Sequence, residues 1–423
     1  MSNPSTRGSL SLLFALQAFA AGLWFVPLGN ILSTLDRAAL IPFVYATSPL
    51  AALFAPLGIA ALADFRYPPS RILAVLALGS AGFLTLACVV LNRGSADLTV
   101  WAVFQLLAVC AMPSWPILNA LVFASLKDHR REFGGIRVWG TIGWMIGGWL
   151  LSYVLRADSS VLALFAGAVA YLGVALVAWR LPPPPKPVLL QRVGWKDLLG
   201  RRAFSLLRDR DYRAVLFTSM LFAIPVAAYY PYTTIHMRSV GEPAPAAMMT
   251  FGQVTEIVAM LGLSVLLVRF RLKSLMLCAL LLGVVRYALN AWAGGAEVDP
   301  LLARALLASG AAVHGLCFTG YFVVAQMFIE TRVNPALRAQ GQALQAMAVG
   351  GVGGLTGALL TGAWYLMAVE GESPPQWRLF WTVLAGVTLV SAIFFAFAYR
   401  GRGRMEASHA ATEPIGQGQA TGE

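Results

Sequence analysis

Glu256 is the only charged residue of an apolar run of about two dozen residues, 244–268, and Gln253 precedes it by three positions. Roughly 20 apolar residues suffice for a helix to cross a bilayer. A carboxylate inside such a helix costs about 3 kcal/mol unless it is paired, protonated or facing water. Because helix positions i and i+3 share a face, the pair predicts a polar site within the membrane. The alternative is a buried glutamate that only bonds a neighbouring helix.

A second polar face lies earlier in the chain, in the apolar run 135–155. Arg137, Thr141 and Trp144 follow the spacing i, i+4, i+7 and therefore share one side of a helix. Arg137 is suited to hold a polar solute or a carboxylate. Since it lies about one turn from the end of the run, it is equally suited to anchor the helix at the membrane surface.

A third set repeats this spacing in the run 302–329, at His314, Phe318 and Tyr321, with Thr319 beside them. A single histidine on an apolar helix is more often a hydrogen-bonded structural residue than a proton relay. Both interpretations of His314 remain open.

Two further features belong to the second half of the sequence. Arg286 is near the middle of its apolar run, which makes it a candidate partner for Glu256 or a member of a purely structural ion pair. Tyr230 lies between Pro225 and Pro231, and two prolines so close together predict a bent or broken helix. Aromatic rings and amides around one carboxylate suit a neutral, flat, polar ligand.

The composition assigns these residues to a membrane protein. The chain of 423 residues is 58% hydrophobic and 12% charged, with a mean hydropathy of +0.71, which excludes a soluble domain. The four cysteines lie inside apolar runs without disulfide or metal-ligand spacing, so we expect packing thiols and no metal or cofactor. Twelve runs are long enough to be spans: 9–33, 39–63, 71–92, 99–126, 135–155, 159–180, 213–235, 244–268, 273–295, 302–329, 339–368 and 376–399.

Lysine and arginine indicate the orientation. With the N-terminus inside, 23 of them fall in inside segments and 6 in outside segments, a bias that predicts an inner (plasma) membrane protein with both termini in the cytoplasm. The net charge of +12 is then an orientation signal, and no nucleic-acid partner is expected. A proline-rich basic segment divides the chain. We expect six-helix bundles at 1–181 and 213–400, a cytoplasmic loop at 182–212 and a disordered tail at 401–423.

Two six-helix halves joined by a basic loop are the plan of the major-facilitator transporters, and similarities between the halves favour it. Basic loops follow both the second and the eighth run, and the runs 135–155 and 339–368 are both rich in glycine, which lets helices pack closely. We therefore predict an all-α membrane protein with the major-facilitator fold, with 12 transmembrane helices in two pseudo-symmetric bundles. The sequence contains no nucleophile or phosphate-binding motif, so we expect no enzyme.

Several motifs resemble those of the nucleoside–proton symporter family within this superfamily. Residues 136–143 are similar to its Arg-x-Trp-Gly-Thr-Ile-Gly signature, and residues 252–256 to its Ser/Gly-Gln-x-x-Glu element. Weaker similarities follow in the same order at 285–289, 314–318 and 334–341. The resemblance extends from about the first span to the last.

This resemblance implies an alternating-access transporter of nucleosides or similar small polar solutes, coupled to protons through Glu256. Its expected partners are the solute, protons and membrane lipids. We expect the solute to be bound by Arg137, Thr141, Trp144, Tyr230, Gln253, Glu256, His314, Phe318 and Thr319.

The chain departs from the family's pattern at three positions. Ala227 and Tyr230 replace a glutamine and an asparagine of the seventh span, and Thr319 replaces an acidic residue of the tenth. Coupling then depends on Glu256 alone or is lost. The alternative is a uniporter or exporter of another solute, such as a sugar or an amphiphilic drug, without proton coupling.

The superfamily resemblance also implies a charge network that gates the inside face, formed by Asp64, Arg66 and Arg71. An orientation signal without a gating role is the alternative for these charges.

Overall fold

The computed structural model describes residues 4–64, 68–126, 129–181 and 203–401. The described part of the first half consists, in chain order, of α1 (Pro4–Phe25), α2 (Leu28–Thr34), η1 (Ala38–Leu40), α3 (Ile41–Asp64), α4 (Pro69–Asn92), α5 (Asp97–Ser125), α6 (His129–Trp149), η2 (Leu150–Leu155) and α7 (Leu162–Arg180).

The second half follows the same plan with more interruptions. Its segments are η3 (Ala203–Arg208), α9 (Arg210–Ala227), α10 (Tyr229–Ser239), α11 (Pro245–Arg269), α12 (Leu272–Ala293), α13 (Pro300–Phe318), η4 (Thr319–Val323), α14 (Val324–Arg332), η5 (Pro335–Leu337), α15 (Arg338–Ala346), η6 (Met347–Gly353), α16 (Gly354–Tyr365), η7 (Leu366–Glu370) and α17 (Trp377–Ala398).

Eleven helical stretches of the described residues are long and apolar enough to cross a membrane. The remaining expected span, the second (39–63), corresponds to η1 and α3, of which the shorter apolar stretch Ala38–Phe54 is described in full. The expected linker, 182–212, lies outside the described residues as far as 202, and its last part is helical in η3 and the start of α9. The expected disordered tail lies outside the described residues from 402 onward.

The first and seventh spans are interrupted at matching places. α1 gives way to α2 at Pro27, and α9 gives way to α10 between Pro225 and Pro231. Proline lacks the N–H that would continue the helical ladder and clashes with the preceding turn. The prediction of a broken seventh span is confirmed, and the same device recurs in the first.

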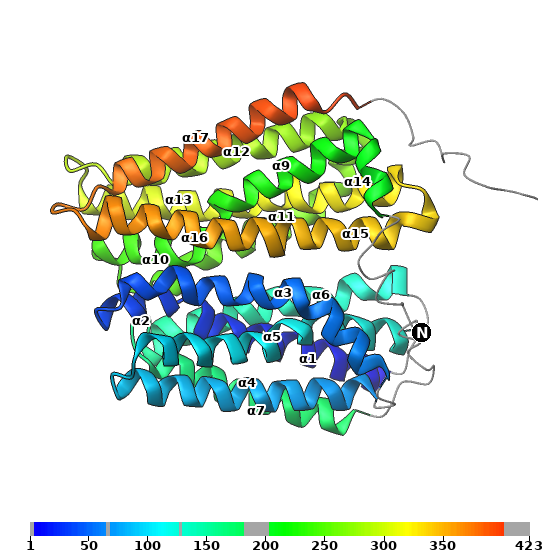
Figure 1. Ribbon diagram of the computed structural model, residues 1–423, viewed down its shortest axis with the longest axis horizontal. Coiled ribbons are helices and arrows are strands. Elements are labelled where there is room, and N and C mark those ends of the chain that lie inside the picture. Colours follow the sequence, from blue (N-terminus) through cyan, green and yellow to red (C-terminus); the bar gives the residue numbers. More distant parts are fainter. Residues whose placement is uncertain (1–3, 65–67, 127–128, 182–202, 402–423) are drawn as a thin grey trace, which may run out of the picture.

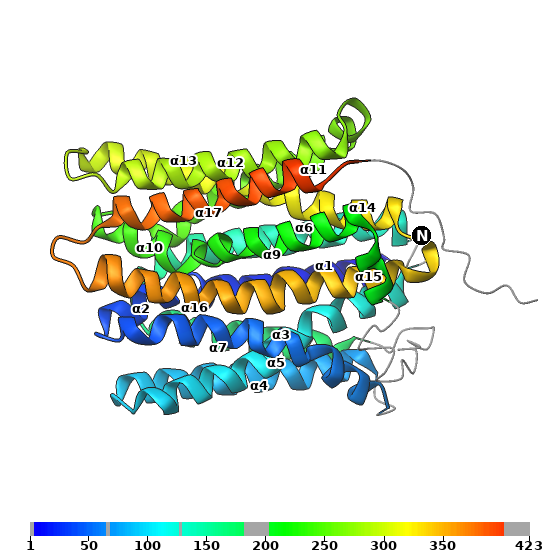
Figure 2. The ribbon, with the colours of Figure 1, turned by 45° about the horizontal axis from the view of Figure 1, so that its top comes forward.

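The two halves lie side by side, with α1–α7 on one side and α9–α17 on the other (Figure 1), and they partly overlap in the turned view of Figure 2. The start of α1 and the end of α17 lie at the same end of the bundle, here called the near end (Figure 1). At the opposite, far end the halves touch through their backbones. A Cβ added to Gly29 would lie 2.8 Å from the carbonyl oxygen of Pro231, and one added to Gly148 would lie 2.9 Å from that of Ala246. The structure is therefore closed at its far end.

Candidate functional site

A cavity of about 230 Å³ lies between the two halves. It is lined by Phe14, Ala18, Trp115, Arg137, Gly140, Thr141, Trp144, Tyr230, Gln253, Glu256 and Phe318. Three helices of the first half (α1, α5 and α6) and three of the second (α10, α11 and α13) contribute these side chains. The cavity is thus shared between the halves.

The first-half wall is built on one face of α6. Arg137, Thr141 and Trp144 all line the cavity, as their spacing predicts. Gly140 lies between them, and α1 packs against it at Phe14. One turn further on, the absence of a side chain at Gly143 lets α1 approach, because a Cβ there would collide with the backbone of Ala15. Phe14 contributes a ring to the same wall.

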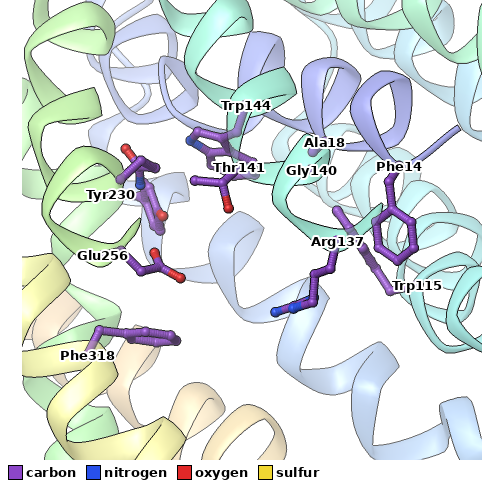
Figure 3. Close-up of a pocket in the computed structure, with 11 residues that line it drawn as sticks. Phe14, Ala18, Trp115, Arg137, Gly140, Thr141, Trp144, Tyr230, Glu256 and Phe318 are labelled. Atoms are coloured by element: carbon purple, nitrogen blue, oxygen red, sulfur yellow. The ribbon is translucent and has the colours of Figure 1, made fainter. Parts of the chain in front are cut away.

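The second-half wall carries the carboxylate. Glu256 and Gln253 line the cavity from α11, and Figure 3 shows the Glu256 carboxylate and the Arg137 guanidinium pointing into it from opposite sides. A Cβ on Gly315 would collide with the α11 backbone at Glu256. Glycine at that position lets α13 lie directly against α11. This contact sets the position of the Glu256 carboxylate in the cavity.

Aromatic rings close the cavity toward the far end. The Tyr230 ring lies 5.7 Å from the Trp144 ring and 5.5 Å from the Phe25 ring, both of the first half. At these distances tilted and edge-on ring pairs attract. Tyr230 therefore joins the two halves on the side of the cavity that faces the far end.

The lining determines what the cavity can bind. Five of its residues are aromatic, and the polar groups are one amide, one hydroxyl, the tyrosine hydroxyl, one carboxylate and one guanidinium. Rings offer faces on which a flat ligand can stack, while the amide and hydroxyl groups fix its orientation. Among the described residues, no group of three or more His, Cys, Asp or Glu is placed to hold a metal ion.

His314 lies behind the cavity instead of on its surface. Its ring stacks on Tyr229 with centroids 3.8 Å apart, and its Nδ1 lies 3.0 Å from Nη1 of Arg286. The Arg286 guanidinium is fully buried over the rings of Tyr229, at 4.2 Å, and Tyr287, at 4.7 Å. Cation–π contacts of this kind stabilise a guanidinium away from water.

The sequence made Arg286 a candidate ion-pair partner of Glu256. These two described side chains form no ion pair, and the guanidinium lies over the rings of Tyr229 and Tyr287 instead. Thr319 is buried as well, at the start of η4, and its hydroxyl has no hydrogen-bond partner. Of the nine expected solute contacts, the structure brings seven together at the cavity and leaves His314 and Thr319 behind it.

The three expected gating residues are only partly described. Arg66 and the side chain of Asp64 lie outside the described residues. Arg71 donates a hydrogen bond to the carbonyl oxygen of Trp179 at 2.7 Å and lies 4.2 Å above its ring. Lys273, at the equivalent place of the second half, donates to the carbonyl oxygen of Ala396 at 2.7 Å. Both cations thus cap the last helix of their own half, and the gating role stays a prediction.

Four lining residues were not among the expected contacts: Phe14, Ala18, Trp115 and Gly140. Trp115 stands out in the sequence as an aromatic in an apolar run beside a polar residue, Asn119. Phe14 and Ala18 carry no such signal, because nothing in the spacing of α1 tells which of its apolar faces meets α6.

Comparison with known proteins agrees with this architecture. A model of the family described as "Nucleoside H+ symporter" matches residues 5–404. YegT of Escherichia coli (strain K12) is 30% identical over 93% of this chain and 94% of its own length. The nucleoside permease NupG of the same organism is 25% identical over 92% of this chain and 95% of its own length.

A crystal structure of the nucleoside transporter NupG superposes with a TM-score of 0.82 at 24% identity, covering 93% of this chain and 99% of that one. A crystal structure of a D-xylose–proton symporter superposes with a TM-score of 0.72 at 11% identity. These likenesses confirm the predicted fold. The family is one of transporters, so the expectation of a multi-pass membrane transporter in place of an enzyme is confirmed as well. The chain belongs to the nucleoside H+ symporter family.

Proposed function

We propose that this protein carries nucleosides, or similarly flat polar solutes, across the membrane together with protons, and that the solute occupies the cavity between the halves. Family membership and the name of the permease NupG support the solute class. The observation that carries the proposal is the position of Glu256 in that cavity, opposite Arg137.

In this proposal the base stacks among the rings and the sugar is held by amide and hydroxyl groups. Trp144, Tyr230 and Phe318 offer ring faces from both halves. Gln253 and Thr141 offer donors and acceptors on opposite walls. A solute held by both halves is released when they separate at one end, which is the geometry that alternating access requires. The closed far end then corresponds to a state with access from the near end, which the charge bias assigns to the cytoplasm.

Glu256 is the proposed coupling group because it is the only carboxylate among the cavity-lining residues. When ionised, it accepts hydrogen bonds and attracts Arg137 across the cavity. When protonated, it is neutral and donates one hydrogen bond. The two forms therefore differ in how strongly they hold the halves and the solute, and this difference is what couples a proton to transport.

The Glu256→Gln variant tests the coupling role in proteoliposomes that take up labelled uridine or adenosine from the medium. A gradient of one pH unit should drive about tenfold accumulation in the native protein at one proton per solute, since one unit is about 1.4 kcal/mol. The variant keeps the shape and a donor but cannot titrate, so accumulation should fall to the equilibrium level while solute counterflow continues.

Glu330→Gln provides the matched control, because Glu330 is an exposed carboxylate on α14 that does not line the cavity. It should accumulate solute like the native protein. Undiminished accumulation by Glu256→Gln would reject the coupling role of Glu256.

A second candidate function, transport of another solute without proton coupling, is favoured by Thr319. The family resemblance implies an acid at this position, and here the buried threonine leaves Glu256 as the single lining carboxylate. The two functions differ in one measurement. Collapsing the pH gradient abolishes accumulation by a symporter and leaves uniport unchanged, and competition by uridine, adenosine and sugars identifies the solute.

A further inference from the structure

The first turn of α11 has an unusual source of hydrogen-bond acceptors. A helix leaves its first amides without partners inside the helix. In α11 the first residue is Pro245, which has no N–H, and the preceding Ala244 has no side chain able to cap the helix. The amides of Ala246 and Ala247 must therefore find acceptors elsewhere.

Both acceptors come from the other half of the protein. The Ala246 amide donates to Oδ1 of Asp158 at 2.8 Å, and the Ala247 amide donates to Oγ of Ser152 at 3.0 Å. The Ser152 hydroxyl in turn donates to Oδ1 of Asp158 at 3.0 Å. One carboxylate of the first half thus organises the cap of a helix of the second half.

The same place is where the two backbones touch. Gly148 approaches the carbonyl oxygen of Ala246, and the Trp149 indole donates to the Thr250 hydroxyl at 3.0 Å. Asp158 is 6% exposed although it lies in a turn between η2 and α7. Its second oxygen, Oδ2, is buried without a hydrogen-bond partner. A buried carboxylate is well placed to hold a closed interface, since opening exchanges its amide donors for water.

We propose that Asp158 and Ser152 form a latch that holds the far end of the transporter closed, and that this latch must release before the far end opens. The latch rests on the alternating access of the proposed function, but it does not depend on the identity of the solute or on proton coupling. Asp158 is a positioning residue in this scheme, because it lies outside the cavity and touches no solute.

Distances between spin labels at Asn92 and Ala296 test the latch in the purified full-length protein without solute. Both residues are exposed at the far end, one in each half, and the four native cysteines are replaced beforehand. Asp158→Ala removes the acceptor of the Ala246 amide. A buried amide left without an acceptor is costly enough that the ratio of open to closed molecules should rise roughly tenfold, seen as a longer distance population.

Asp97→Asn is the matched control. Asp97 is another far-end carboxylate, but its bond runs to Arg37 of the same half, at 2.8 Å. This variant should keep the native distance distribution.

Two milder variants keep the test valid if Asp158→Ala does not fold. Ser152→Ala removes only the second cap, so it should give an intermediate shift. Asp158→Asn keeps an oxygen acceptor for the Ala246 amide without the charge, so it should stay closed. Native distance distributions in both Ser152→Ala and Asp158→Ala, or in Ser152→Ala alone if Asp158→Ala does not fold, would overturn the latch. Because no solute is present, this result leaves the nucleoside assignment and Glu256 untouched.

Discussion

Tyr230 contacts both halves of the protein and the cavity at once. Its ring lies between Trp144 and Phe25 of the first half, and it neighbours Tyr229 of its own helix at 4.8 Å. Through Tyr229 the chain of contacts continues to His314 and Arg286. Tyr230, at which the chain departs from the family's pattern, is therefore backed by a buried layer of aromatic rings and one arginine.

Replacing Tyr230 separates the effect of its ring from that of its hydroxyl. Tyr230→Phe keeps the ring contacts, so the KM for nucleoside uptake should change by no more than about twofold. Tyr230→Ala removes the ring, and because stacking of a base on an aromatic side chain is worth about 1–3 kcal/mol, KM should rise roughly tenfold or more. Tyr153→Ala, at an exposed tyrosine on η2, should behave as the native protein. An unchanged KM for Tyr230→Ala would exclude stacking on this ring.

Helical spacing predicts cavity residues where one helix face is involved, and fails where packing sets the rotation. Arg137, Thr141 and Trp144 line the cavity as their spacing indicates. His314 shares the spacing of Phe318, yet only Phe318 reaches the cavity. Gly315 presses α13 against α11 and directs the neighbouring His314 toward Tyr229. A close helix contact of this kind depends on the partner helix, which no spacing within α13 reveals.

At the scale of helices, glycine sets how closely α1 and α6 pack. A Cβ on Gly143 would collide with the carbonyl oxygen and backbone of Ala15. Gly147 of the same face would meet the carbonyl oxygen of Phe19 at 2.9 Å. α6 therefore presents a glycine groove to α1, and this contact holds Arg137 and Phe14 on one wall.

Adding one methyl group to this groove should weaken the first half. We expect Gly143→Ala to lower the free energy of unfolding by about 1–3 kcal/mol, the range for overpacked sites, because the Ala15 backbone cannot move aside without displacing α1. Thermal unfolding in detergent measures this as a lower Tm.

Gly134→Ala is the control on the same helix, where an added Cβ meets nothing within 4 Å. Alanine is favoured over glycine in a helix by about 1 kcal/mol, so this variant should be as stable as the native protein or more so. Equal stability of both variants would show that the α1–α6 contact tolerates a side chain at Gly143.

The helices are predictable from the sequence, but only some of their interruptions are. Apolar runs predict the spans, and Pro225 and Pro231 predict the break of the seventh. The π-helical segments η4, η6 and η7 interrupt the tenth and eleventh spans. They have no such marker in the sequence, because a π-helical turn arises where packing inserts an extra residue into the helix. One of them, η4, begins directly after Phe318, where such turns often accompany function.

At the scale of the molecule, the charge of Asp158 differs between a closed and an open far end. Burial raises the pKa of this carboxyl above its ordinary value, while the Ala246 amide, the Ser152 hydroxyl and the charge of Arg238 act in the opposite direction without cancelling the rise. When the far end opens, the carboxyl meets water and its pKa returns toward about 3.9. The closed form therefore binds a proton more tightly than the open form.

The form with the higher pKa is favoured by acid. The proton-linked preference for the closed far end should be complete below the ordinary pKa of about 3.9 and should be lost as the pH rises through the raised pKa of the closed form. Spin-label distances between Asn92 and Ala296, recorded as the pH is lowered, should show a growing closed population in the native protein. Asp158→Asn cannot titrate at this position, so its distribution should lose this dependence, whereas Asp97→Asn should retain it. A native protein whose far-end distances ignore pH across this range would mean that Asp158 has the same proton affinity in both forms, and that the latch holds by its hydrogen bonds without responding to acid.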